Sequence, residues 1–185
     1  MTAPQMSADV LAPPCAGVSA HGQAIDALAG ELLAQLRREQ QAPEGSASAQ
    51  PPLPQEVEDA LYAWGVGCHE AGRHADASAL FGALCRRQPP SLRLFKAAGA
   101  SHLAGADPTR SAQAYAQAHA LATADAEVLF FWAQAEALLG RAASAAARAR
   151  QAAGLSQAYP HKWPGLQAWC DELLVQLETA SSMQP

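Results

Sequence analysis

The sequence predicts an all-α protein built from repeated helix pairs. Half of the 185 residues are hydrophobic, and much of that share is alanine, the best helix former, while the β-branched residues that favour strands are few. Small side chains also recur at steps of 34 residues, which is the length of a tetratricopeptide repeat (TPR). Together these observations predict a TPR superhelix of three helix pairs, with an N-terminal helix before it and a C-terminal capping helix after it.

The regions outside the repeats differ from them in composition. Residues 1–22 are rich in Pro, Ser, Ala and Gly without periodicity, so we expect a disordered tail. Residues 23–40 carry apolar side chains at three- and four-residue steps, which predicts an amphipathic helix. Residues 41–54 contain a proline-rich run that cannot be helical and predict a linker. Residues 158–180 place tryptophans and leucines on one side, which is typical of a capping helix.

The array spans residues 55–157, and its period places the three repeats at 58–91, 92–125 and 126–157. Two antiparallel helices approach closely only where side chains are small. The first helix of each pair carries such a residue at the crossing point: Gly65, Gly99 and Ala133. One residue on the second helix is expected to fill the gap one turn further on: Phe81, Tyr115 and, in the third repeat, only Ala149.

The turns inside the repeats predict where the second helices begin and end. Glycine marks the turn in the first and third repeats. In the second repeat Gly105 comes one residue early, and Asp107 and Pro108 are expected to open the next helix as its N-cap and first residue. The alanine-rich second helix of the third repeat is expected to begin at Ala142 and to stop at Gly154.

Composition excludes several classes of function. The net charge is -5 and the sequence has no basic run, which argues against a nucleic-acid partner. No stretch approaches the roughly 20 apolar residues that a membrane-spanning helix needs, and the first residues lack the pattern of a signal peptide, so we expect a cytoplasmic protein. The four cysteines contain no C-x-x-C pair, which argues against a disulfide framework or a zinc site.

The sequence shows no catalytic constellation. His69 and His74 are five residues apart with Gly72 between them, so they do not form the pair that binds a metal from one helix face, and we interpret them as unrelated helix residues. No glycine-rich loop with a lysine is present to hold a phosphate. We therefore expect no enzymatic activity, no cofactor and no metal.

The face of each first helix that lies opposite its packed positions is expected to line a concave groove that binds an extended peptide. That face combines aromatic, aliphatic and charged side chains, which we call the predicted groove residues: Tyr62, Val66, His69, Arg93, Lys96, Ala100, Leu103, Phe130 and Gln134. Two alternatives remain open. In the first, Tyr62 and Phe130 belong to the core or merely cover exposed surface. In the second, Arg93 and Lys96 are ordinary solvated charges.

Several stretches of the repeats also match a known family. They are residues 61–65, 70–77 and 81–85 in the first repeat, 93–95 with 99–100 in the second, and 133–139 in the third. The run that ends in Leu84 and Cys85 is seldom found in other TPRs. On these residues the chain resembles the class II translocator chaperones of bacterial type III secretion, the SycD/LcrH-like family.

The resemblance implies a cytoplasmic chaperone without ATPase activity. It would hold hydrophobic, pore-forming translocator proteins of bacterial virulence systems in a soluble, secretion-competent state, and its groove would take a short proline-and-leucine motif near the translocator's N-terminus. It also implies a homodimer through the N-terminal helix, whose apolar stripe is Ile25, Leu28, Leu32 and Leu36. The competing interpretations are a generic TPR adaptor that mediates protein–protein interaction, a metal protein or enzyme, and a structural subunit of a larger assembly.

Overall fold

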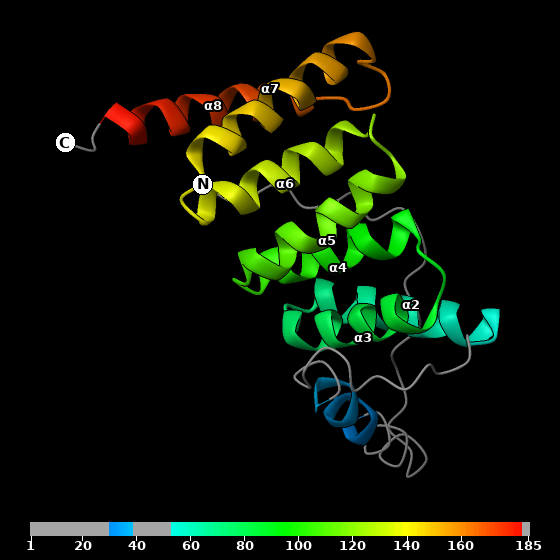
Figure 1. The fold of residues 1–185 in the computed structure, drawn as a ribbon. Helices are drawn as coiled ribbons and strands as arrows, with labels where there is room; N and C mark the ends of the chain where they lie inside the picture. The colour runs from blue at the N-terminus through cyan, green and yellow to red at the C-terminus, as the bar shows by residue number, and fades with distance from the viewer. Residues whose placement is uncertain (1–29, 39–52, 183–185) are drawn as a thin grey trace.

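The computed structural model describes residues 30–38 and 53–182, and every regular element within them is an α-helix (Figure 1). A short helical segment covers residues 30–38. Seven helices follow: α2 (Gln55–Glu70), α3 (His74–Arg87), α4 (Leu92–Ala104), α5 (Pro108–Leu121), α6 (Ala126–Leu138), α7 (Ala142–Ala158) and α8 (Leu166–Ser182). Each helix packs chiefly against its neighbours in the chain, so the helices stack as three antiparallel pairs capped by α8. The predicted all-α TPR fold is confirmed.

The crossing points of the first two pairs leave no room for a side chain. A Cβ atom built on Gly65 would lie 2.8 Å from the ring of Phe81, and one built on Gly99 would lie 2.8 Å from the ring of Tyr115. Both rings are almost fully buried, at 1% exposure each. The glycines are therefore required by the close approach of the paired helices, as the period of the sequence predicts.

The turn of the second repeat combines a predicted feature with an unexpected one. Asp107 caps α5, where its carboxylate accepts a hydrogen bond from the backbone N–H of Arg110 at 3.0 Å, and Pro108 takes the first helical position. The residue before the cap, Ala106, has a φ of 58°. Gly72 occupies the equivalent place in the first repeat with a φ of 73°, so the second turn adopts a glycine conformation without a glycine.

One helix end differs from the sequence expectation. α7 does not stop at Gly154 but continues to Ala158. A glycine inside a helix costs about 1 kcal/mol relative to alanine, yet buried residues lie on both sides of it, Ala152 at 0% and Ser156 at 3% exposure. Packing of this last turn therefore outweighs the weak local preference to end the helix.

Two hydrophobic clusters form the ends of the core. The first joins α2, α3 and the start of α4, and it includes Leu33 and Leu36 from the segment 30–38. The second joins α6, α7 and α8, where the buried face of α8 consists of Leu166, Cys170, Leu173 and Leu177. In the described part of the chain, none of the helices combines the length and the apolar composition that a membrane crossing requires.

Candidate peptide-binding surface

Tyr62 and Val66 lie half-buried on α2, where both pack against the first hydrophobic cluster. The ring of Tyr62 is 5.4 Å from the ring of Phe81, centroid to centroid. On the solvent side the guanidinium carbon of Arg93 lies 3.6 Å from the Tyr62 ring centroid. Arg93 Nη2 also donates to Asp59 Oδ1 at 3.4 Å. Arg93 on α4 is therefore placed across the junction between the first and second repeats.

Lys96 is the second charged residue on this surface, and it is not an ordinary solvated charge. Its ammonium donates to Asp125 Oδ2 at 3.4 Å and also to Glu127, both in the first turn region of α6, and its side chain is 23% exposed. Burial opposes the charge of Lys96, but the hydrogen bond and the charge of Glu127, assisted by Asp125, raise its pKa above the ordinary value. Lys96 thus stays protonated and joins the second repeat to the third.

The structure brings His69 into contact with residues that the sequence interpretation had left unrelated. The His69 and His74 rings lie 5.0 Å apart, centroid to centroid, because the turn at Gly72 folds α3 back against the end of α2. His69 Nδ1 is also 3.2 Å from the hydroxyl oxygen of Ser101 on α4. Burial, together with the nearby His74, lowers the pKa of His69 below the ordinary value. Among the described residues no group of three or more metal-ligating side chains is present.

Phe130 does not face a groove in this structure, contrary to the sequence expectation. It is 2% exposed and belongs to the second hydrophobic cluster, with its ring centroid 5.3 Å from that of Phe131 and 6.0 Å from that of Trp169. The capping helix α8 contacts α6 directly and supplies Trp169. The alternative that Phe130 is a core residue is therefore correct. The remaining predicted groove residues are half-buried: Ala100, Leu103 and Gln134.

The stripe expected to form a dimer interface is partly used inside the chain itself. Leu36 is 3% exposed and packs in the first hydrophobic cluster, because the segment 30–38 lies against the first helix pair and Arg37 forms an ion pair with Asp76. Leu36 is thus unavailable to a second copy in this arrangement. Leu32 is 39% exposed. Ile25 and Leu28 lie outside the described residues.

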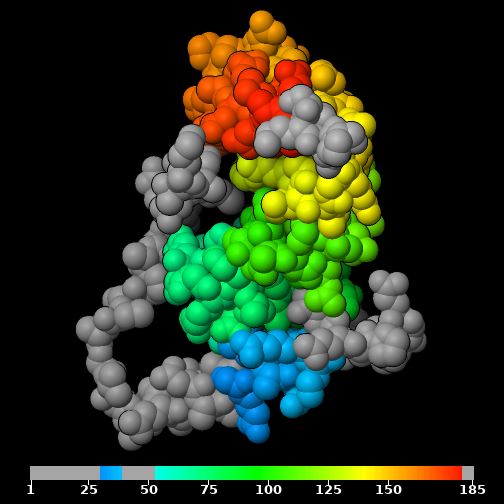
Figure 2. Space-filling model, turned by 90° about the vertical axis from the view of Figure 1, so that its left-hand side faces the viewer, coloured from blue at the N-terminus to red at the C-terminus, as the bar shows by residue number. Residues whose placement is uncertain are grey.

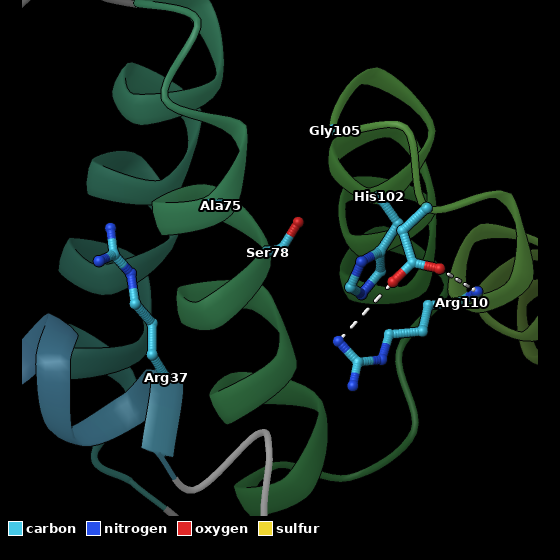
Figure 3. A pocket seen from close by; sticks show the side chains of 7 residues that line it. Arg37, Ala75, Ser78, His102, Gly105 and Arg110 are labelled. Atoms are coloured by element: carbon cyan, nitrogen blue, oxygen red, sulfur yellow. Dashed lines mark hydrogen bonds and ion pairs between the residues drawn. The ribbon is translucent and has the colours of Figure 1, made fainter.

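A half-open pocket of about 230 Å³ lies between the first and second repeats, and none of the predicted groove residues lines it (Figure 3). Its lining comes from the segment 30–38, α3, α4, the α4–α5 turn and α5: Arg37, Ala75, Ser78, His102, Gly105, Asp107 and Arg110. The two guanidinium groups there are balanced by carboxylates, since Arg37 pairs with Asp76 and Arg110 lies 3.7 Å from Asp107. Sequence reasoning missed this pocket, because its residues come from five segments with no shared spacing.

The three cysteines in the described part of the chain have the properties of buried thiols rather than of nucleophiles. Burial raises the pKa of Cys68, and it raises the pKa values of Cys85 and Cys170 to about 11 each. A thiol with such a pKa is protonated near neutral pH and is a poor nucleophile and metal ligand.

Comparison with known proteins identifies the fold. No protein-family model and no curated protein matches the chain. Among solved structures, PcrH from Pseudomonas aeruginosa in complex with the chaperone-binding region of PopB matches with a TM-score of 0.62 and 25% identity, over 68% of this chain and 100% of that chain. The translocator chaperone SycD from Yersinia enterocolitica matches with a TM-score of 0.64 and 20% identity, over 71% of this chain and 90% of that chain.

A third match extends over more of the chain. A type III secretion complex from Aeromonas hydrophila matches with a TM-score of 0.65 and 22% identity, over 88% of this chain and 99% of that chain. The chain therefore has the TPR fold of the type III secretion translocator chaperones PcrH and SycD, as the resemblance predicted. The fold is not confined to them: the first TPR unit of Spaghetti (RPAP3) bound to an HSP90 peptide matches with a TM-score of 0.60 at 12% identity.

Proposed function

We propose that this chain is a type III secretion chaperone that binds hydrophobic translocator proteins in the cytosol and keeps them soluble and competent for secretion. The observation that carries the proposal is the match along the full length of peptide-bound PcrH at 25% identity. The peptide-bound SycD structure, with a peptide of the translocator YopD, supports it at the level of the fold. The proposed activity is binding alone, without catalysis or a cofactor.

The binding surface in this proposal is the face shared by α2 and α4. It leaves out the two predicted groove residues on α6, the buried Phe130 and the half-buried Gln134. Its apolar part consists of four half-buried residues: Tyr62, Val66, Ala100 and Leu103. A translocator segment with long apolar stretches would aggregate in water, and an array of packed helices covers an extended segment at little ordering cost because it is already folded. Such a surface suits a cargo that must be held and later released.

The proposal includes a cytoplasmic location and a homodimer in the cargo-free state. The SycD structures, one of them described as an alternative dimer, support the dimer at the level of the fold. Since Leu36 is buried within the chain, the dimer contact would have to use Leu32 and residues beyond the described range, or require the segment 30–38 to move.

The direct test is binding of a labelled peptide copied from the chaperone-binding region of PopB. We expect Tyr62→Ala to weaken binding about tenfold or more, because an aromatic anchor that fills a pocket contributes about 2 kcal/mol. The matched control is Tyr159→Ala, since Tyr159 is 60% exposed and lies at the far end of α7. Circular dichroism checks that both variants keep their helices. Equal binding by both variants would contradict the assignment of this face.

The alternative is a generic TPR adaptor, which the similarity to the HSP90-peptide complex of Spaghetti favours. The peptide SRMEEVD of that complex separates the two functions in the same assay. Binding of SRMEEVD together with no binding of the PopB region would support the adaptor and reject the chaperone. Co-purification from the native host of a protein with membrane-spanning segments would support the chaperone.

A further inference from the structure

The ring of Tyr62 is the half-buried aromatic of the proposed binding face, and its environment differs on its two sides. Toward the core it packs near Phe81, which is 1% exposed. Toward solvent its face is covered by the guanidinium of Arg93, at 3.6 Å from the ring centroid. That distance is van der Waals contact, so no other side chain can lie on this face of the ring while Arg93 stays in place.

Arg93 is held in this position by weak contacts. Its ion pair with Asp59 is a single contact at 3.4 Å, and the two side chains are 50% and 53% exposed. An exposed ion pair shifts an equilibrium by roughly fivefold at most, and an exposed cation–π contact by about two- to fivefold. Moving Arg93 into water therefore costs little free energy. Burial of an apolar cargo side chain on the Tyr62 ring is able to offset that cost.

Lys96 provides the contrast on the same face. Its ammonium lies between Asp125 and Glu127, and its side chain is 23% exposed, so it has two partners and half the exposure of Arg93. Displacing Lys96 would leave two partly buried carboxylates without their cation, which is far more costly. Of the two basic residues on this face, Arg93 is the displaceable one and Lys96 is the fixed one.

From these contacts we infer that Arg93 occupies the aromatic subsite on Tyr62 in the free protein and that an apolar side chain of the cargo must displace it to bind there. Arg93 is thus a specificity-determining residue that competes with the cargo from within the chain. It lowers the affinity for apolar segments and keeps the Tyr62 ring covered in the absence of cargo. The inference rests on the proposed function, because it assumes that the face around Tyr62 binds cargo.

The binding test uses the PopB-region peptide with Arg93→Ala, Asp59→Ala and, as a matched control, Arg150→Ala, an exposed arginine on α7. We expect Arg93→Ala to bind the peptide about five- to twentyfold more tightly than the unchanged protein, Asp59→Ala about twofold more tightly, and Arg150→Ala equally. The advantage of Arg93→Ala should shrink as salt is added, since salt also weakens the Asp59 pair. Equal or weaker binding by Arg93→Ala would overturn the inference.

A second measurement tests the cover on Tyr62 without any cargo. Hydroxyl-radical footprinting followed by mass spectrometry reports the solvent exposure of each tyrosine. In Arg93→Ala the labelling of Tyr62 should rise severalfold, while that of the exposed Tyr159 stays unchanged. Unchanged labelling of Tyr62 would reject the inference. If Tyr62 becomes exposed in Arg93→Ala but no form of the protein binds the PopB peptide, the proposed function is rejected. The result would still support the contact in which Arg93 covers the Tyr62 ring.

Discussion

The first and third repeats bring two helices together at the same point with different combinations of side chains. In the first repeat Gly65 lies under the ring of Phe81, and a Cβ at Gly65 would lie 2.8 Å from that ring. In the third repeat both residues are alanines, Ala133 and Ala149, and both are fully buried. Two methyl groups occupy much less volume than one benzyl group, so the third crossing is packed by smaller side chains than the first. What the two crossings share is a small, buried residue on the first helix of the pair, which lets the helices approach closely.

The same two repeats also differ on the face that carries the predicted groove residues. Tyr62 and Phe130 occupy equivalent places two repeats apart, yet Tyr62 is half-buried under the side chain of Arg93, whereas Phe130 is 2% exposed under the capping helix. An arginine also covers an aromatic ring in the third repeat, where Arg148 lies 3.7 Å from the Trp132 ring centroid. Whether a residue is accessible to a partner therefore depends on which neighbouring element covers it. Its position in the repeat does not determine this.

The largest expected effect comes from filling the crossing point of the first repeat. Gly65→Leu should destabilise the protein by about 3 kcal/mol or more, because the new side chain cannot fit under Phe81 without moving α3. Urea denaturation followed by circular dichroism measures the loss. The expected result includes a separate early transition if the first repeat unfolds before the others.

Gly67 on the same helix offers a matched control for this change. Gly67 is exposed, and a Cβ built there would meet no atom within 4 Å. Gly67→Leu should leave the free energy of unfolding unchanged or raise it by up to about 1 kcal/mol through helix propensity. A similar loss of stability in both variants would show that the close approach at Gly65 is not what requires glycine.

The next effect separates the two arginines that cover aromatic rings. Arg148 is 22% exposed and donates to the buried Glu136 at 2.6 Å, so Arg148→Ala should cost about 2–4 kcal/mol by leaving that carboxylate unpaired. Arg93→Ala, on the half-exposed side chain, should cost less than about 1 kcal/mol. Adding Glu136→Gln to Arg148→Ala should recover more than half of the loss, since no charge is then stranded. Equal losses for the two alanine variants would remove the distinction between an interior arginine and a displaceable one.

How much of this structure is predictable from sequence depends on the range of the interactions. The crossing glycines and the Asp107 cap are predictable, because both depend on residues close in the chain or separated by one period. The burial of Phe130 is not, because it depends on how α8 folds back over α6. The ion pairs of Lys96 are also not predictable. Its partners Asp125 and Glu127 are about 30 residues away in the chain, and the sequence around a lysine does not indicate which distant carboxylate it will pair with.

The smallest expected effect concerns the turn, where the second repeat departs from the other two. Ala106 holds a φ of 58°, while Gly72 and Gly140 hold 73° and 72° at the equivalent places. An L-residue in that region is strained by about 1–2 kcal/mol, and glycine offsets part of the gain because it makes the unfolded chain more flexible. Ala106→Gly should therefore stabilise the protein by about 0.5–1 kcal/mol in urea denaturation. Ala104→Gly, two residues earlier and still helical, should instead be neutral or destabilising, so that equal shifts in both variants would argue against strain at Ala106.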